Sequence, residues 1–112
     1  MNLLPLPKQK FYSEVGRSRV LDADLPNGIA WRHAKLTLSY EQVTLTVLAE
    51  KRYQLQRDQI YSINRYYDLG LFSQGIVISH SCDAYPASLI FWTFSFSALK
   101  AELEQLGYDL RA

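Results

Sequence analysis

The stretch AKLTLSYEQVTLTV, residues 34–47, decides the fold. Its two halves each alternate apolar and polar residues, and only the short segment Tyr40-Glu41-Gln42 separates them. Successive side chains of a strand point to opposite faces of a sheet, so this alternation is typical of a strand that buries one face. The stretch therefore predicts a tight β-hairpin with one buried face.

The same period of two continues along the chain. Residues 52–56 and 71–80 alternate in the same way, and residues 87–96 are predicted to form the last strand. Residues 59–67 differ, because Ile60 and Ile63 are three positions apart, which predicts a bend or bulge. Residues 17–25 are predicted to form a further strand, followed by the favoured two-residue turn Asn27-Gly28.

The period changes near the C-terminus. Leu99, Leu103 and Leu106 have the i, i+4, i+7 spacing of one helix face, with Ser97 as N-cap and Gly107 as the C-terminal cap. A helix is therefore predicted over residues 97–107. A meander of strands hides its edges and its apolar face by curling. The predicted fold class is mainly β (α+β): a bent β-barrel of about seven antiparallel strands closed by one C-terminal α-helix.

Length and composition limit the class of protein. The 112 residues are expected to form one domain, 1–112, with residues 1–10 as a loose N-terminal arm. The net charge of +1 gives no general attraction to nucleic acid or to an anionic membrane. A single cysteine favours a reducing compartment, and no signal peptide or membrane span is evident. We therefore expect a cytoplasmic protein that binds no nucleic acid.

Several stretches together resemble the pleckstrin-homology-like (PH-like) superfold. They are LTLSYEQVTLTV, DQIYSI and GLFSQGIVISH, followed by LIFWTF and a terminal helix that ends in LEQLGY. The resemblance covers about residues 32–108 and is closest to small bacterial PH-like or GRAM-like domains. It implies a bent seven-stranded barrel closed by a C-terminal helix. It also implies binding rather than catalysis, with phosphoinositides, peptides or further copies of the chain as ligands.

The resemblance allows one site to be tested on the sequence. Lipid-binding PH domains hold inositol phosphates with lysines and arginines around the first hairpin loop. Here that loop is Tyr40-Glu41-Gln42, which is short and contains an acidic residue and no basic one. We therefore expect that the chain does not bind phosphoinositides.

The segment His80-Ser81-Cys82-Asp83 contains the single cysteine and one of the two histidines. A nucleophilic site needs a cysteine, an adjacent base and a third group that orients the base. Residues two apart in a turn seldom meet productively, so we expect a turn in which His80 continues the buried phase of its strand. We predict no catalytic residue in this segment, and Cys82 is expected to be dispensable.

Asp22, Asp24 and His33 form the alternative candidate site. A two-residue turn at Asn27-Gly28 would place Asp22 opposite His33 and Asp24 opposite Trp31. Two carboxylates and an imidazole could hold a divalent metal or act as an acid and a base. The solvated face of a hairpin explains the same residues equally well. The alternative function is thus a small-molecule or metal-binding β-barrel protein, conceivably an enzyme; otherwise no cofactor is expected.

The last predicted strand is apolar in both phases. Ile90, Trp92, Phe94 and Phe96 share one phase, whereas Leu89 and Phe91 share the other. A half-exposed strand alternates, so this strand is predicted to be covered on both faces, in part by a second molecule. The leading function is a non-catalytic PH-like interaction module that binds a protein partner or itself, as a homodimer or larger. The predicted interface residues are Leu89, Phe91, Trp92, Leu71 and Phe72.

Overall fold

The computed structural model describes residues 11–21, 26, 28–67 and 74–111, and the fold is mainly β with one C-terminal helix, as predicted. Eight strands form one sheet in the order β4-β3-β2-β1-β7-β6-β5-β8. Neighbouring strands are antiparallel, except that β8 is parallel to β5. The elements are β1 (Tyr12–Leu21), β2 (Ile29–Leu38), β3 (Gln42–Val47), β4 (Lys51–Gln56), the 3-10 turn η1 (Arg57–Gln59), β5 (Ile60–Tyr67), β6 (Gln74–His80), β7 (Ser88–Thr93), α1 (Phe96–Gln105) and β8 (Leu110–Arg111).

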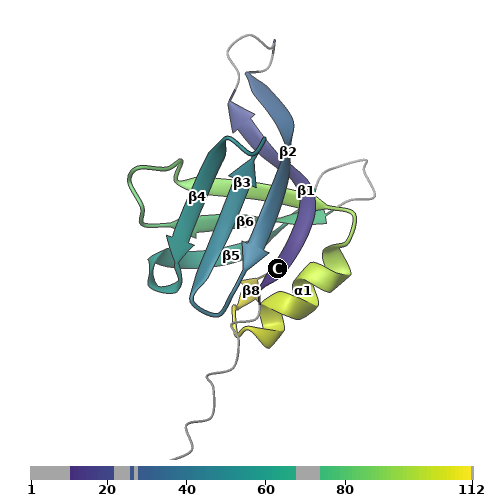
Figure 1. Cartoon of the computed structure of the whole chain (residues 1–112), viewed down its shortest axis with the longest axis vertical. Helices are drawn as coiled ribbons and strands as arrows, with labels where there is room; N and C mark the ends of the chain where they lie inside the picture. Colours follow the sequence, from purple (N-terminus) through teal and green to yellow (C-terminus); the bar gives the residue numbers. More distant parts are fainter. Residues whose placement is uncertain (1–10, 22–25, 27, 68–73, 112) are drawn as a thin grey trace, which may run out of the picture.

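The sheet is sharply curled into a half-barrel. In Figure 1, β1 to β4 run steeply across the view, and β5 to β7 run across it in a different direction. The two halves join where β1 meets β7, with Arg17 opposite Trp92 and Ser18 opposite Phe91. Gly16 in β1 permits this close crossing, because a β carbon there would lie 2.0 Å from the Trp92 carbonyl oxygen of β7. Gly75 in β6 permits an equally close approach on the other side of β7, where a β carbon would lie 2.0 Å from the Phe91 carbonyl oxygen.

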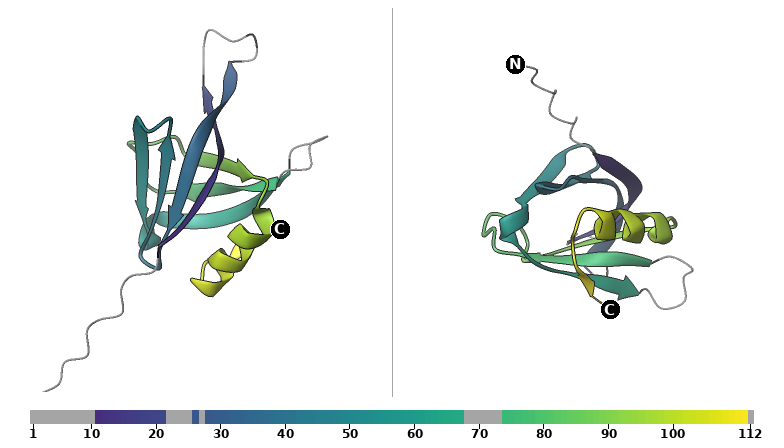
Figure 2. Two further views of the ribbon diagram at one scale, coloured as in Figure 1. Left: turned by 45° about the vertical axis from the view of Figure 1, so that its right-hand side comes forward. Right: turned by 90° about the horizontal axis from the view of Figure 1, so that it is seen from below.

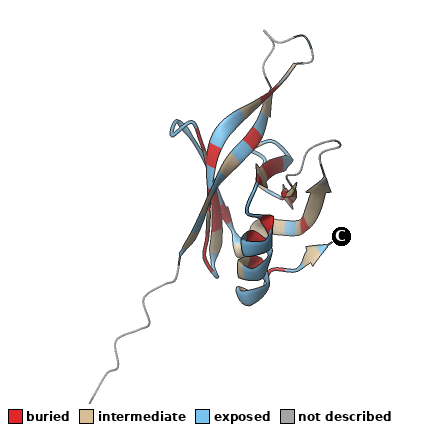
Figure 3. Cartoon of the chain, turned by 90° about the vertical axis from the view of Figure 1, so that its right-hand side faces the viewer, coloured by how far each residue is buried: buried red, intermediate tan, exposed pale blue. Residues whose placement is uncertain are grey.

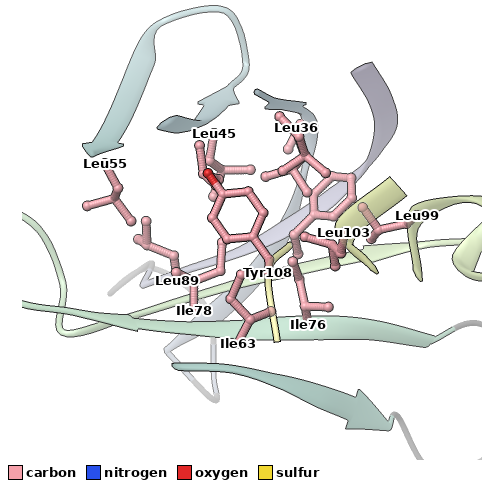
Figure 4. Close-up of a cluster of buried hydrophobic side chains, with 14 of the residues drawn as sticks. Leu36, Leu45, Leu55, Ile63, Ile76, Ile78, Leu89, Leu99, Leu103 and Tyr108 are labelled. Carbon is pink, nitrogen blue, oxygen red and sulfur yellow. The ribbon is translucent and has the colours of Figure 1, made fainter. Parts of the chain in front are cut away.

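The core fills the space between the two halves of the sheet. The predicted hairpin of residues 34–47 is confirmed: β2 and β3 pair Leu36 with Leu45, and both side chains are fully buried. Isoleucines of β5 and β6 and Phe91 of β7 contribute to the same cluster from the other half (Figure 4). The alternating sequence pattern therefore places one face of each half in a shared apolar interior.

Helix α1 closes one opening of this half-barrel. Seen from below in Figure 2, α1 lies across the space that the strands surround. Leu99 and Leu103 are fully buried, which confirms the predicted helix stripe, and the exposed side of α1 faces solvent (Figure 3). The predicted cap is also confirmed, because Gly107 has a φ of +81° and the Tyr108 N–H donates to the Leu103 carbonyl at 2.9 Å.

The boundaries of the helix differ slightly from the prediction. Helix α1 spans Phe96–Gln105, with Ser95 rather than Ser97 as the N-cap. The Ser95 side chain makes no capping bond; instead, its backbone N–H donates to the Thr93 hydroxyl at 3.1 Å. The hydroxyl of the preceding strand thus orients the start of the helix.

Two further features complete the fold. The register of β5 against β6 shifts between Ile60 and Ser62, which confirms the predicted irregularity in that strand. The two-residue strand β8 was not predicted, because the sequence after Gly107 is too short to show a period. Within the described part of the chain, no helix has the length and apolar character required to cross a membrane.

Truncation of the helix stripe tests this packing. Leu103→Ala should lower the free energy of unfolding by about 2–5 kcal/mol, because it leaves a cavity where α1 meets the sheet. Urea denaturation followed by circular dichroism measures the change, with Glu104→Ala on the exposed side of α1 as the control. A loss below about 0.5 kcal/mol, the range of ordinary surface substitutions, would show that α1 is not docked in this way.

Candidate binding surfaces

The predicted interface residues on β7 divide between the two faces of the sheet. Leu89 is 5% exposed and Phe91 is fully buried, so the prediction that they lie on an outer surface is wrong. The reason is that β7 lies between β1 and β6, with its odd-numbered residues facing the other half of the sheet. Trp92 is half-buried on the outer face. Leu71 and Phe72 lie outside the described residues.

The register of β1 against β2 differs from the one that would bring the residues of the alternative site, Asp22, Asp24 and His33, together. β1 and β2 pair from Leu21 opposite Ile29 onward, so the predicted two-residue turn at Asn27-Gly28, with its register, is wrong. The residue opposite His33 is Arg17 rather than Asp22, and the residue opposite Trp31 is Arg19 rather than Asp24. Asp22 and Asp24 themselves lie outside the described residues. The part of the chain that is described contains no group of three or more His, Cys, Asp or Glu that could hold a metal ion.

His80 holds the turn between β6 and β7. It is 6% exposed, as predicted for the last buried position of its strand. Its Nδ1 accepts a hydrogen bond from the Cys82 N–H at 3.0 Å, so its Nε2 carries the proton and lies 2.6 Å from the Pro86 carbonyl oxygen. Both ring nitrogens therefore bind backbone, and the half-buried Cys82 thiol is paired with no base in this turn.

Arg57 hydrogen-bonds to two separate segments at the end of the half-barrel that α1 closes. Its guanidinium donates hydrogen bonds to the carbonyls of Tyr40 (2.9 Å), Leu106 (3.0 Å) and Gly107 (2.8 Å). It also lies 4.3 Å from the ring centroids of both Tyr40 and Tyr108. One cation thus joins the first hairpin loop, η1 and the end of α1. The basic group nearest this loop is occupied by backbone carbonyls.

Two tyrosine hydroxyls are perturbed by this packing. Burial raises the pKa of Tyr108, and the neighbouring Arg57 cation acts in the opposite direction. The Tyr108 hydroxyl donates to the carbonyls of Ser39 and Tyr40. Burial, and then a hydrogen bond to Glu14, raises the pKa of Tyr12 to about 12. Both hydroxyls therefore stay protonated donors at neutral pH.

An aromatic-basic patch lies on the outer side of the β1–β7 crossing. We define it as Arg17, Arg19, Trp31, Tyr66, Trp92 and Phe94. Arg17 lies opposite Trp92 and Arg19 lies opposite Trp31, so these pairs share a face. The ring centroids of Trp31 lie 6.0 Å from Tyr66 and 6.4 Å from Trp92, and those of Trp92 and Phe94 are 5.0 Å apart. Phe94 is 80% exposed.

Positive charge extends from this patch over the outer face of β1 to β4. One cross-strand row on this face runs from Val15 in β1 through Lys35 in β2 and Thr46 in β3 to Arg52 in β4. Both cations are exposed, as are Arg17 and Arg19. The described outward-facing positions of these four strands include no aspartate or glutamate. The near-neutral net charge of the chain therefore conceals a face that is locally cationic.

Comparison with known proteins gives the fold alone. No family model matches the sequence, and a search of curated proteins found no match. The chain is similar to the C-terminal domain of an unknown protein from Leishmania infantum, with 14% identity and a TM-score of 0.57 over 85% of this chain and 81% of that chain. It is also similar, with 14% identity and a TM-score of 0.48 over 93% of this chain and 91% of the other, to a structure described as "Mutations in SsgB correlate to longitudinal cell division during sporulation of Streptomyces coelicolor". The first of these supports a small β domain with a curled sheet.

Replacement of Arg57 tests its structural role. Arg57→Lys should lower the free energy of unfolding by about 1.5–3 kcal/mol, because an ammonium cannot reach three carbonyls in the geometry of the guanidinium fork. Chemical denaturation measures the loss, and Arg52→Lys on the exposed outer face is the matched control. Equal stability of Arg57→Lys and the unmodified chain would show that Arg57 does not hold the loop and helix together.

Two substitutions in the turn after β6 test which side chain, that of His80 or that of Cys82, stabilises the turn. Cys82→Ser should change the free energy of unfolding by less than about 1 kcal/mol, because the thiol makes no hydrogen bond within the described residues. His80→Ala should cost about 2 kcal/mol or more, because it removes both ring contacts from a buried position. If thermal unfolding shows the reverse order, the thiol rather than the imidazole holds this turn.

Proposed function

We propose that the chain is a single-domain, non-catalytic, PH-like interaction module that binds a protein partner, working in the cytoplasm. Support for the PH-like assignment comes from seven antiparallel strands, β1 to β7, curled around one core with a single C-terminal helix at the opening. This is the architecture that the resemblance of residues 32–108 implies. The binding role is supported by the aromatic-basic patch, because contiguous exposed apolar surface usually marks an interaction site.

The patch favours an acidic protein segment with apolar side chains as the partner. Tryptophan, tyrosine and arginine are the residues that most often dominate the energy of protein interfaces, and all three occur here. Arg17 and Arg19 flank the rings, and the surrounding outer face is cationic, so carboxylates of a partner would be attracted and oriented. An exposed Phe94 provides an apolar contact beside them.

Single-stranded nucleic acid fits the same surface less well. Stacking of bases requires aromatic faces that are open to the strand. Here Trp31, Tyr66 and Trp92 are half-buried and pack against one another in tilted arrangements. Rings that are covered by their neighbours offer edges and a shared apolar surface rather than separate stacking platforms. A peptide with apolar side chains is the better complement.

Self-association is a second candidate, favoured by the 80% exposure of Phe94. A two-fold dimer needs one self-complementary patch. A contact centred on the aromatic-basic patch would also bring Arg17 and Arg19 of both copies together, and this repulsion favours a partner of opposite charge. Light scattering distinguishes the two: a dimer that Phe94→Asp converts to a monomer would assign the patch to a second copy of the chain.

A labelled synthetic peptide tests the proposal. The probe carries glutamates interspersed with leucines, and fluorescence anisotropy reports binding. Arg17→Glu should weaken binding at least about tenfold, equivalent to ~1.4 kcal/mol, whereas Lys100→Glu on α1 should have no effect. Binding should also weaken as salt rises from about 0.05 M to about 0.5 M, because the rim charges are screened.

Two further probes serve as controls in this experiment. A peptide with glutamine in place of glutamate should bind more weakly, and an oligothymidylate of similar length should not compete. Equal binding of the glutamine peptide would overturn the assignment of an acidic partner. Tighter binding of the oligothymidylate would overturn the assignment of a protein partner.

A further inference from the structure

A hollow opens at the end of the half-barrel opposite to the part that Tyr108 and α1 close. It lies where β1 and β7 diverge beyond their crossing, and its volume is about 290 Å³. Lys51 begins β4 and Val20 lies near the end of β1, far along these strands from the β2–β3 loop that Tyr108 contacts. We call this hollow the mouth. Its walls include Ser18, Val20, Lys51, Tyr53, Ser88 and Leu89.

The wall of the mouth contains a buried polar residue, Ser18. Ser18 is only 2% exposed, and it lines the hollow. Its hydroxyl has no hydrogen-bond partner among the residues that the structure describes. A buried hydroxyl without a partner costs free energy, so most such groups in proteins are satisfied. A ligand with a hydrogen-bonding atom would satisfy this one.

The charges and apolar groups of the mouth define the ligand. Lys51 and Arg19 both line it, whereas none of the lining residues that the structure describes is acidic. Val20, Leu89 and the ring of Tyr53 give it an apolar wall. Tyr53 is held in place by an edge-to-face contact with Tyr85, whose ring centroid lies 5.1 Å away. A cationic rim over an apolar wall suits an anion that carries a hydrocarbon group.

We propose that the mouth binds a small organic anion, with a carboxylate or phosphate head near Lys51 and the Ser18 hydroxyl and an apolar body against Val20 and Leu89. The hollow lies at the lower end of the ~300–1,000 Å³ range of ligand pockets, so the ligand is smaller than a drug-sized molecule. The mouth shares Arg19 with the aromatic-basic patch, but Ser18 and Lys51, the residues that the tests below replace, do not belong to the patch. The proposal therefore does not depend on the protein partner.

Isothermal titration with hexanoate tests the proposal, and hexyl phosphate in a parallel titration identifies the preferred head group. Hexanamide, with the same hydrocarbon chain and no charge, should bind at least about tenfold more weakly. Inorganic phosphate should also bind more weakly, because it lacks the apolar body. The anion should also raise the melting temperature, and more so as its concentration rises, because it binds the folded state.

Three variants locate the site. Lys51→Met should weaken hexanoate binding at least about tenfold, and Lys100→Met on α1, which removes the same charge elsewhere, should not. Ser18→Ala should weaken binding while leaving the melting temperature unchanged or higher, because a buried hydroxyl without a partner destabilises the folded chain. A merely structural Ser18 would instead show a lower melting temperature.

Two results would overturn the proposal. Saturable binding of neither hexanoate nor hexyl phosphate at millimolar concentration would show that the mouth is not an anion site. Equal binding of hexanamide, or binding unaffected by Lys51→Met, would show that the charge of the mouth plays no part. Neither result bears on the acidic peptide, so failure here and failure of the protein-binding proposal are distinguishable.

Discussion

The contact between β1 and β7 holds the two halves of the sheet together, and the rest of the molecule depends on it. Two residue pairs make this contact, and Gly16 allows the backbones of β1 and β7 to approach closely enough. The Thr93 hydroxyl strengthens the same junction, because it lies within hydrogen-bond distance of the Glu14 carboxylate in β1 and accepts the N–H of Ser95 at the start of α1. Strand pairing, sheet curvature and the direction of the helix are thus determined at one place.

The crossing also separates the surfaces on which the proposals rest. Ser18 and Phe91 face inward, whereas Arg17 and Trp92 face outward. The inward pair leads into the core and, where the strands diverge, into the mouth with its buried hydroxyl. The outward pair forms the centre of the aromatic-basic patch. A single strand crossing therefore separates the inner hollow that we propose binds a small anion from the outer patch that we propose binds an acidic protein segment.

Much of the fold could be predicted, because alternation in residues 34–47 and the spacing of Leu99 and Leu103 each allow one geometry. The residues of the outward surface could not be predicted, because residues 89–96 are apolar in both phases. Nothing in that pattern indicates which phase faces the core. Asn27-Gly28 predicted the wrong register, since a favoured dipeptide does not exclude a longer connection. The turn at Leu48 and Ala49 has positive φ at both positions without glycine, so it carries no sequence signal. Trp31 joins the patch only through that unpredicted β1–β2 register.

The two tryptophans of the chain, Trp31 and Trp92, both belong to the aromatic-basic patch, so their indole N–H signals report on it alone. The most direct test is a titration of the nitrogen-15-labelled chain with the glutamate-leucine peptide, followed by two-dimensional NMR. Both indole signals should shift together and saturate, and the glutamine peptide should leave them in place. Saturable binding with both indole signals unchanged would contradict the proposed role of the patch, because the acidic segment would then occupy another surface.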